Sequence, residues 1–276
     1  MITLGLIIDE YHLEKKAQEF IKYMQGKAKI NFYVEERYFL DFSNKDFKED
    51  LFLVKAKGDL VINFARLIDR ETHIPIINSP TSIWLCYNRF LNSTLLKKSG
   101  IRVPEFSLNP IDKDPPLQNY IVKNIRDQRN YSFNPLINER EGIITVRDER
   151  ALIEAQGGKE NYQYLYYQQF IRSEWEYKVY CIGDDLFFYK QIPVLFDPDK
   201  MKSRKEIKEI PELSEIAYKA LKAVGLKIAS IDFLQSENGD FYLTDINSSP
   251  NFNYIQNGAK IVGDYLIRIA KASDVR

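Results

Sequence analysis

Cysteine and histidine are scarce in this chain of 276 residues, and their scarcity excludes several kinds of site. Two cysteines, Cys86 and Cys181, cannot form a disulfide framework or a four-thiolate zinc site. Two histidines, His12 and His73, leave little material for a histidine-rich metal site or an imidazole-based catalytic triad. If the protein is an enzyme, we therefore expect its chemistry to rest on carboxylates, ammonium and guanidinium groups, and amides.

An excess of charge of either sign is also missing, because 39 lysines and arginines balance 39 aspartates and glutamates. This balance argues against a protein that binds nucleic acid by neutralising many phosphates, and against a basic protein of the membrane surface. No segment approaches the roughly 20 uncharged apolar residues of a membrane span. The short apolar run at the N-terminus has no basic leader and fits a buried strand rather than a signal peptide. We expect a cytoplasmic protein with neither nucleic acid nor membrane as a partner.

Apolar residues are plentiful, since 45% of the chain is hydrophobic, which is enough for a core in one or two domains. Apolar side chains at helical spacing from Leu13 to Met24 predict a helix that Gly26 ends. Buried strands are predicted at 2–8, 29–34 and 59–64. Strands that alternate with helices favour an α/β domain, which we expect over residues 1–79.

The rest of the chain combines helices with a strand-rich section. Residues 80–100 are predicted to be helical with a break near Asn88, and residues 212–225 have the clearest helical pattern. Strands are predicted at 119–124, 142–146 and 161–171, a hairpin over 176–192, and a short helix at 151–158. The whole chain is therefore expected to have an α/β fold of mixed (α+β) character.

Two aspartates are predicted to face each other in the last hairpin, SIDFLQSENGDFYLTDINSSP. Asn238-Gly239 is a strong two-residue turn signal, and it aligns the flanking strands so that Asp232 lies opposite Asp245, with Cβ atoms about 5 Å apart. Strand alternation puts Asn247 on the same face as Asp245. Two facing carboxylates repel each other unless water or a cation lies between them.

Oxygen donors without histidine or cysteine suit a hard cation, and Mg²⁺ fits better than Zn²⁺. Mg²⁺ is typically held by one or two carboxylates together with substrate phosphates. The hairpin alone leaves two readings open: a magnesium site, or a solvated edge hairpin whose acidic residues have no joint role.

The segment GLKIASIDFLQSENGDFYLTDINSSPNF resembles the C-terminal strand pair of the ATP-grasp superfamily. Other segments resemble landmarks of that superfamily in the expected order: NSPTSIWLCYNRF, IVKN, YYQQFI and EYKVYCIGDDLFFY. The resemblance covers roughly residues 75–270. It implies an ATP-grasp fold over residues 80–276, with a central lid at 102–166 and a C-terminal metal and ATP subdomain at 167–276.

Two branches of that superfamily compete. The inositol-tris/tetrakisphosphate kinases are similar in the motifs that here are NRF (88–90), YKVYCIG (177–183) and DIN (245–247). The RimK-like amino-acid ligases typically have an Asp/Glu-x-Arg hairpin, Glu-x-Asn and an Arg- and Gly-rich stretch, which residues 192–211 lack. This comparison favours the kinases.

The chain also departs from those kinases. Phe133 stands ten residues after Lys123, where they have a substrate-touching histidine, and Pro250-Asn251 stands where they have Pro-Gly. The loop after Lys123 lacks the glycines of many ATP-grasp lids, a role that arginines at 126 and 129 could take over. The acceptor is therefore not fixed by the resemblance.

The resemblance implies roles for individual residues. One or two Mg²⁺ ions that bridge the ATP phosphates would be held by Asp232, Asp245 and Asn247. ATP itself would be bound by Arg89, Lys123, Gln168, Gln169, Phe170, Ile171 and Lys190, with the residues from 168 to 171 flanking adenine mainly through their backbone. Lys178 and Asp245 are the expected catalytic residues. The expected substrate contacts are Lys178, Asn247, Asn251, Arg126 and Arg129.

Three of these residues have a structural alternative to the implied role. Lys123 would otherwise be an ordinary edge-strand lysine, Arg89 a residue at the start of a surface helix, and Lys178 part of a surface salt bridge.

The leading expectation is an ATP- and Mg²⁺-dependent kinase that transfers the γ-phosphoryl group to a hydroxyl of a polyol or phosphorylated polyol, an anionic small molecule. The alternative is a carboxylate–amine ligase of the RimK-like type, which works through an acyl phosphate. A third hypothesis is a nucleotide-binding module without turnover. The sequence does not predict the oligomeric state.

Overall fold

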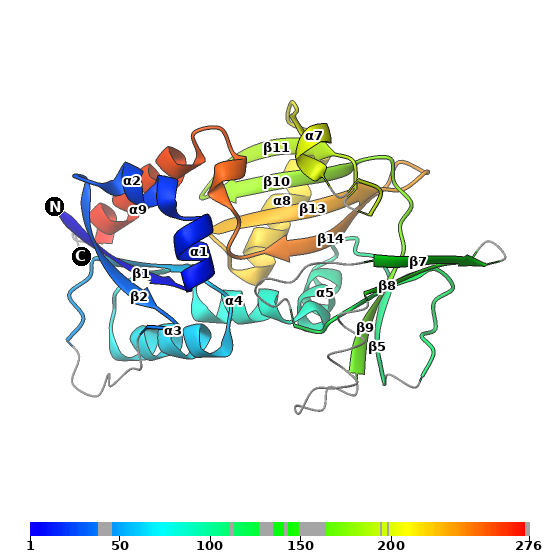
Figure 1. Cartoon of the computed structure of the whole chain (residues 1–276), viewed down its shortest axis with the longest axis horizontal. Helices are drawn as coiled ribbons and strands as arrows, with labels where there is room; N and C mark the ends of the chain where they lie inside the picture. The colour runs from blue at the N-terminus through cyan, green and yellow to red at the C-terminus, as the bar shows by residue number, and fades with distance from the viewer. Residues whose placement is uncertain are drawn as a thin grey trace.

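Among the residues that it describes, this computed structural model has three β-sheets with helices packed on them (Figure 1). The described residues are 1–37, 46–110, 113–126, 135–140, 143–148, 164–193, 195–197 and 199–273. The helix predicted at 151–158 and the candidate substrate residue Arg129 lie outside them.

The N-terminal part of the chain forms a parallel sheet in the order β2-β1-β3-β4. Its strands are β1 (Ile2–Ile8), β2 (Ala28–Val34), β3 (Leu51–Lys55) and β4 (Ile76–Ile77). Strands β1 and β3 are buried along almost their whole length, as expected for parallel strands covered on both faces. The strands predicted at 2–8 and 29–34 are confirmed.

The strand predicted at 59–64 is wrong, because these residues begin helix α3 (Asp59–Glu71). A window of six residues is too short to separate a buried strand from a helix. The buried side chains of α3 follow one face of a helix: Val61, Ile62, Ala65 and Ile68. The place in the sheet belongs instead to β3, which pairs with β1.

The helix predicted near the N-terminus is split into α1 (Glu10–Lys15) and α2 (Gln18–Met24). Asp9 caps α1, because its carboxylate accepts the backbone N–H of His12 at 2.7 Å. Gly26 ends this region with a positive φ of 75°, a conformation that glycine adopts without steric cost.

The break predicted near Asn88 is confirmed, since α4 (Pro80–Tyr87) and α5 (Arg89–Lys98) meet there. The Asn88 side chain accepts the backbone N–H of Leu91 at 3.0 Å and so caps the start of α5. Arg89 is thereby fixed at the first position of a helix.

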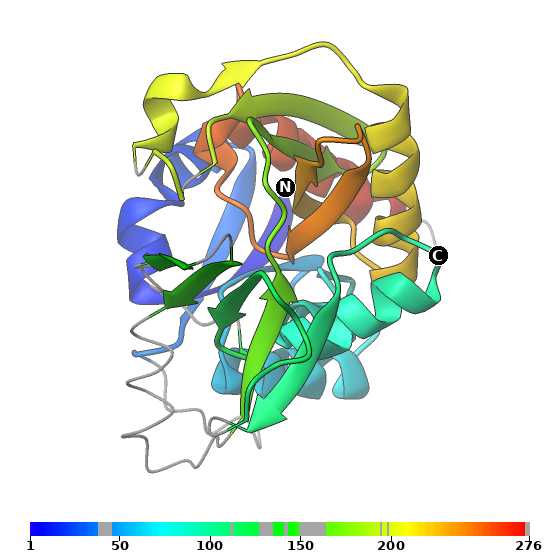
Figure 2. The ribbon, with the colours of Figure 1, turned by 90° about the vertical axis from the view of Figure 1, so that its right-hand side faces the viewer.

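The middle of the chain forms a mixed sheet, the lid sheet, in the order β5-β9-β6-β8-β7. Its strands are β5 (Phe106–Pro110), β6 (Tyr120–Lys123), β7 (Pro135–Arg140), β8 (Ile143–Asp148) and β9 (Tyr164–Gln169). Three predicted strands are confirmed in their described parts: β6, β8 and β9. Figure 2 shows this sheet in front, with the C-terminal sheet above and behind it.

The C-terminal sheet is antiparallel, in the order β12-β11-β10-β13-β14. Its strands are β10 (Glu176–Ile182), β11 (Asp185–Gln191), β12 (Lys205–Glu206), β13 (Ile228–Gln235) and β14 (Phe241–Asn247). The remaining elements are α7 (Lys200–Ser203), α8 (Pro211–Val224), the 3₁₀ helix η1 (Phe252–Tyr254) and α9 (Gly258–Ser273). The hairpin of β10 and β11 and helix α8 are confirmed predictions, whereas α9 was not predicted.

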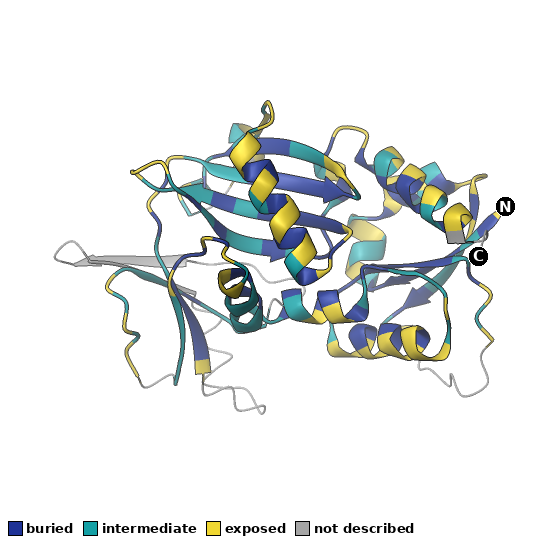
Figure 3. Cartoon of the chain, turned by 180° about the vertical axis from the view of Figure 1, so that it is seen from behind, coloured by how far each residue is buried: buried dark blue, intermediate teal, exposed yellow. Residues whose placement is uncertain are grey.

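The two faces of the C-terminal sheet belong to different cores. One face, with Val179 and Ile231, packs with α5 and α8, and α8 turns a buried stripe inward and an exposed stripe outward (Figure 3). The other face, with Tyr180 and Ile228, shares a core with α2, α9 and the parallel sheet. Lys178 alternates onto this second face, which is turned toward the N-terminal part of the chain.

Within the described residues, no helix is both long and apolar enough to span a bilayer.

Candidate active site

Asp232 and Asp245 are direct Cα partners in the pairing of β13 with β14, as predicted. The reason differs from the predicted one. The strands are linked by a longer turn, in which Ser236 accepts the N–H of Gly239, and not by a two-residue Asn-Gly turn. A register shift between Asp232 and Phe233 then compensates for this longer turn, so that the two aspartates still face each other.

Lys178 lies beside Asp232, because β10 pairs with β13 so that these two residues are Cα partners. Its ammonium group forms an ion pair and hydrogen bond with the Asp232 carboxylate, and it lies 3.6 Å from a carboxylate oxygen of Glu176. All three side chains are largely buried. Sequence reasoning expected Lys178 near ATP or substrate, but its pairing with a proposed metal ligand depends on the strand order.

The protonation of Lys178 follows from these neighbours. Burial alone disfavours the charged amine, but the carboxylates of Asp232 and Glu176 outweigh burial and raise the pKa of Lys178 above its ordinary value. Lys178 is therefore a fixed cation next to the facing aspartates.

Asn247 follows Asp245 on β14 by two positions, so both side chains leave the strand on the same face. The Asn247 carboxamide oxygen accepts the backbone N–H of Ser249 at 2.8 Å, which fixes the orientation of the amide. Two carboxylates and one amide oxygen form a donor set suited to Mg²⁺. Among the described residues there is no cluster of three or more His, Cys, Asp or Glu side chains that could hold a metal.

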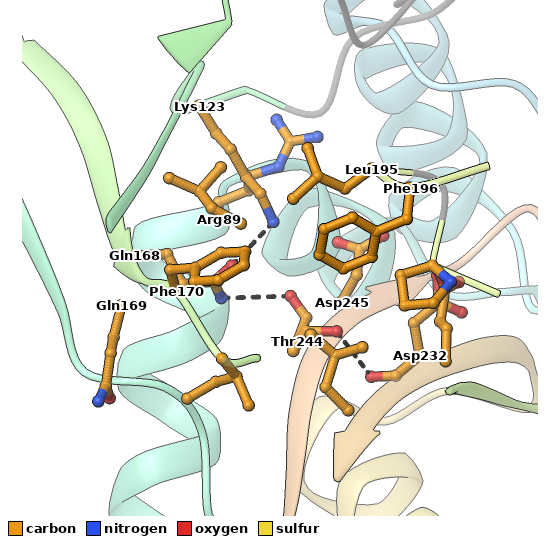
Figure 4. Close-up of a pocket in the computed structure, with 15 residues that line it drawn as sticks. Arg89, Lys123, Gln168, Gln169, Phe170, Leu195, Phe196, Asp232, Thr244 and Asp245 are labelled. Atoms are coloured by element: carbon orange, nitrogen blue, oxygen red, sulfur yellow. Dashed lines mark hydrogen bonds between the residues drawn. The ribbon is translucent and has the colours of Figure 1, made fainter. Parts of the chain in front are cut away.

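A cavity of about 400 Å³ lies between the lid sheet and the C-terminal sheet (Figure 4). This volume is in the range of small-molecule sites. Eight of the residues predicted to bind ATP or metal line it: Arg89, Lys123, Gln168, Gln169, Phe170, Ile171, Asp232 and Asp245. They come from α5, β6, β9 with the segment after it, and the hairpin of β13 and β14, so the fold joins residues far apart in the sequence.

Lys123 is held in this cavity by Gln168, whose amide oxygen accepts a hydrogen bond from its amine at 2.8 Å. The Gln168 amide nitrogen in turn donates to the backbone oxygen of Thr244 at 3.3 Å, next to Asp245 (Figure 4). A single glutamine therefore connects the lid lysine to the hairpin of the two aspartates. The same amide nitrogen lies 3.4 Å from the hydroxyl oxygen of the buried Tyr166. Burial raises the pKa of Tyr166 to about 12, so its hydroxyl stays neutral.

Arg89 secures the segment that follows Lys123. One of its terminal guanidinium nitrogens donates to the backbone oxygens of Asn124 at 3.0 Å and Arg126 at 2.9 Å, and its backbone N–H donates to Ile125. The arginine predicted to reach the triphosphate thus also anchors the lid to α5.

The segment from 168 to 171, predicted to flank adenine, lies along the cavity. Two of its backbone donors are already engaged, because Gln169 donates to Glu105 at 2.7 Å and Phe170 donates to Asn119 at 2.9 Å. These two N–H groups are therefore engaged within the protein.

Other predicted residues do not line the cavity. The amine of Lys190 lies 4.3 Å from the ring centre of Trp175, on the face of the hairpin opposite to Lys178. Arg126 forms an ion pair with Asp59, with a nitrogen–oxygen distance of 3.1 Å.

Asn251 caps η1, because its side-chain oxygen accepts the backbone N–H of Asn253. Lys178 and Asn247 are also outside the lining, although each is tied to residues of the hairpin.

Several lining residues were missed by sequence reasoning: Ile121, Glu176, Pro193, Leu195, Phe196, Leu234 and Thr244. Glu176 and Leu234 were detectable, because strand alternation puts them on the same face as Lys178 and Asp232. Leu195 and Phe196 lie in the segment after β11, which has no periodic pattern, so no sequence signal pointed to them.

Opposite charges divide this cavity. Asp232 and Asp245 lie on the side of the C-terminal sheet, while Arg89 and Lys123 lie on the side of α5 and the lid sheet (Figure 4). Such a division can bind an anion through the bases and a cation through the acids, with anion and cation in contact.

No known family model matches the sequence, and no curated protein sequence matches it. Solved structures do match. D-alanine–D-alanine ligase from Bacillus anthracis, complexed with ATP, has a TM-score of 0.68 and 14% identity, covering 100% of this chain and 99% of that chain. The ATP-grasp ligase PsnB, complexed with minimal precursor, Mg and ADP, has a TM-score of 0.67 and 12% identity over 97% of both chains.

A RimK domain ATP-grasp protein from Sphaerobacter thermophilus matches with a TM-score of 0.65 and 12% identity, covering 95% of this chain and 99% of that chain. These matches extend over nearly the whole length of each protein, including the parallel sheet, the lid sheet and the C-terminal sheet. The chain therefore has the ATP-grasp fold that its sequence motifs predict.

Proposed function

We propose that the chain is an ATP- and Mg²⁺-dependent carboxylate–amine ligase. The observation that carries this proposal is the divided cavity, in which Asp232 and Asp245 oppose Arg89 and Lys123 beside the segment from 168 to 171. The ATP-grasp fold adds support, because proteins of similar fold are named as ligases and were solved with ATP or with Mg and ADP.

ATP would lie in the cavity with its phosphates toward Lys123 and Arg89. Lys123 reaches the cavity from the end of β6 and is oriented by Gln168, which favours phosphate binding over the role of an ordinary edge-strand lysine. The apolar lining by Phe170, Ile171 and Leu234 suits a nucleobase.

Mg²⁺ would be held by Asp232, Asp245 and Asn247, whose oxygen-only donor set fits a hard cation. When bound, the metal supplies charge neutralisation for the phosphate oxygens. The ammonium group of Lys178 offsets part of the charge of Asp232 and Glu176 at the same place.

A ligase is favoured over the kinase that the sequence motifs suggested. None of the three solved structures described above is named as a kinase. Among the described lining residues, the basic side chains are Arg89 and Lys123, and Lys178 is already shared by two carboxylates. Few cations of the described lining are thus left for a phosphorylated acceptor. An inositol phosphate kinase stays the second candidate, because the segment YKVYCIG and the residues Asp245 and Asn247 resemble its motifs.

The proposed reaction has two steps. A carboxylate oxygen of the substrate attacks the γ-phosphorus of ATP, the bond to the β–γ bridging oxygen breaks, and ADP leaves with an acyl phosphate formed. The amine nitrogen then attacks the acyl carbon, inorganic phosphate leaves, and the nitrogen loses one proton as the amide forms. The protein contributes mainly by positioning and by opposing charge as it develops.

The test is to incubate the protein with ATP and Mg²⁺ and a matrix of carboxylates, amines and polyol phosphates, while inorganic phosphate and ADP are measured. A ligase requires a carboxylate and an amine together, and releases one phosphate for each ADP. Formation of ADP without phosphate release would identify a kinase. Nucleotide binding without any acceptor-dependent turnover would support a binding module.

A further inference from the structure

A buried lysine of the N-terminal sheet contacts the loop that follows the proposed metal residue Asn247. Lys55 is the last residue of β3, and only 1% of its surface is exposed. Its amine donates to the backbone oxygens of Ser249, at 3.2 Å, and of Pro250. It also lies 4.2 Å from the ring centre of Phe252. A lysine amine is costly to bury, so this location requires the loop contacts to compensate for lost water.

A second buried side chain from the N-terminal part completes the contact. Asn78, which follows β4, is 2% exposed, and its amide nitrogen donates to Ser248 at 2.8 Å. The Asn78 amide oxygen accepts the backbone N–H groups of Lys227 at 2.8 Å and of Ile228 at 3.0 Å. Lys55 and Asn78 thus bind three consecutive backbone carbonyls, those of residues 248 to 250.

The loop that carries these carbonyls is also hydrogen-bonded to the proposed metal ligand Asn247. The N–H of Ser249 donates to the carboxamide oxygen of Asn247, so the position of Ser249 helps to orient the amide of Asn247. Lys55 holds Ser249 at its carbonyl oxygen, on the other side of the Cα from the N–H that contacts Asn247, while Asn78 holds the carbonyl of the peptide group to which that N–H belongs. The path from Lys55 to Asn247 therefore consists of two hydrogen bonds through one residue.

We propose that Lys55 is a positioning residue for the metal site, which fixes the orientation of the Asn247 amide from the N-terminal sheet through Ser249. This inference rests on the proposed function, since it assumes that Asn247 binds the metal. It also gives the N-terminal sheet a direct part in the activity, in addition to the core that it shares with α9.

The experiment compares Lys55→Met and Lys55→Gln with the full-length wild type. Mn²⁺ is the probe, and its binding in the presence of a non-hydrolysable ATP analogue is followed by electron paramagnetic resonance. Binding of the analogue without metal is measured separately by calorimetry. Lys29→Met is the matched control, because Lys29 is exposed on β2 of the same sheet.

Groups that orient metal ligands typically change metal affinity about tenfold to a hundredfold when they are removed. We expect Mn²⁺ binding to weaken by at least about tenfold in Lys55→Met and by less in Lys55→Gln, which keeps a hydrogen-bond donor. Metal-free nucleotide binding should stay within about twofold of wild type, as should both properties of Lys29→Met.

Two results would overturn the inference. One is Mn²⁺ binding by both Lys55 variants equal to that of wild type. The other is an equal loss of metal-free nucleotide binding, which would mean that Lys55 supports the whole pocket rather than the metal ligand. A wild-type protein that binds neither nucleotide nor Mn²⁺ would instead refute the proposed function, so the two failures are distinguishable.

Discussion

Lys178 and Asp232 face each other across β10 and β13, and the lysine ammonium is ion-paired with one of the two carboxylates proposed to hold Mg²⁺. The same lysine lies 3.6 Å from Glu176. A fixed cation and the proposed metal therefore share one group of carboxylates, and this arrangement determines how substitutions should separate catalysis from metal binding.

Replacing Lys178 with methionine should lower kcat without weakening metal binding. The variant loses the positive charge beside Asp232 and Glu176, at the edge of the proposed metal site, and we expect kcat to fall by about a hundredfold or more. The concentration of Mg²⁺ for half-maximal activity should stay equal or fall, because Asp232 no longer has a competing cation. Steady-state kinetics over a Mg²⁺ titration provide the measurement.

The matched control is Lys222→Met, which removes an exposed lysine of α8. Its kinetics should equal those of wild type. A rise in the Mg²⁺ requirement of Lys178→Met with an unchanged kcat would contradict the role given to Lys178.

Replacing Asp245 with asparagine should abolish metal-dependent turnover. The substitution keeps the size of the side chain but removes one of two facing carboxylates, so we expect turnover to fall by about a hundredfold or more. Thermal unfolding should occur at the wild-type temperature or above, because two like charges no longer face each other. Turnover equal to that of wild type would remove the proposed metal site.

Replacing Lys123 with methionine should weaken ATP binding. A hydrogen bond to a charged group contributes about 1.5–3 kcal/mol, which corresponds to a loss of affinity of roughly tenfold to a hundredfold. Gln168→Leu should cause a smaller loss, since it removes the group that orients the amine but not the amine itself. Calorimetry with ATP measures both, and an unchanged dissociation constant in Lys123→Met would place the phosphates elsewhere.

The buried Lys55 predicts how stability depends on pH. Burial is the main cause that lowers the pKa of Lys55 from 10.5 to about 7. Between these two values the unfolded chain holds a proton that the folded chain has released, so this group makes the free energy of unfolding rise with pH over that range. Below about pH 7 both states are protonated, and the cost of the buried charge is fully present.

Lys55→Met removes this contribution. Urea unfolding at several pH values should therefore show the variant gaining stability relative to wild type at pH 6, with the difference shrinking as the pH rises toward 10. A difference in unfolding free energy that does not change with pH would contradict the lowered pKa.

The sequence predicts elements with strong local signals, and the structure agrees at these places. Such signals mark the helix break near Asn88, the hairpin of β10 and β11, and helix α8. The strand predicted at 59–64 failed because local apolar composition fits strand and helix equally over so short a window. Strand β3 escaped prediction although it is entirely buried, because a run of four apolar residues is too short a signal to identify a strand.

The sequence predicted those parts of the candidate site in which the residue type itself indicates the chemistry, such as a pair of aspartates. The facing of Asp232 and Asp245 follows from the hairpin, and even there the true register depends on an irregularity that the turn signal does not reveal. The link from Lys123 through Gln168 to Thr244 and the contact of Lys55 with the loop after Asn247 join distant parts of the chain. Such contacts depend on the order of strands and sheets, which local patterns do not contain.

The most direct test of the proposed ligase follows the oxygen atoms of the carboxylate substrate. Once a carboxylate and an amine that together support turnover are found, the carboxylate is labelled with ¹⁸O, and the inorganic phosphate released is analysed by mass spectrometry. An acyl phosphate intermediate predicts that one labelled oxygen moves from the carboxylate to the phosphate at each turnover. Phosphate without label, or a γ-phosphoryl group that stays on the product, would contradict it.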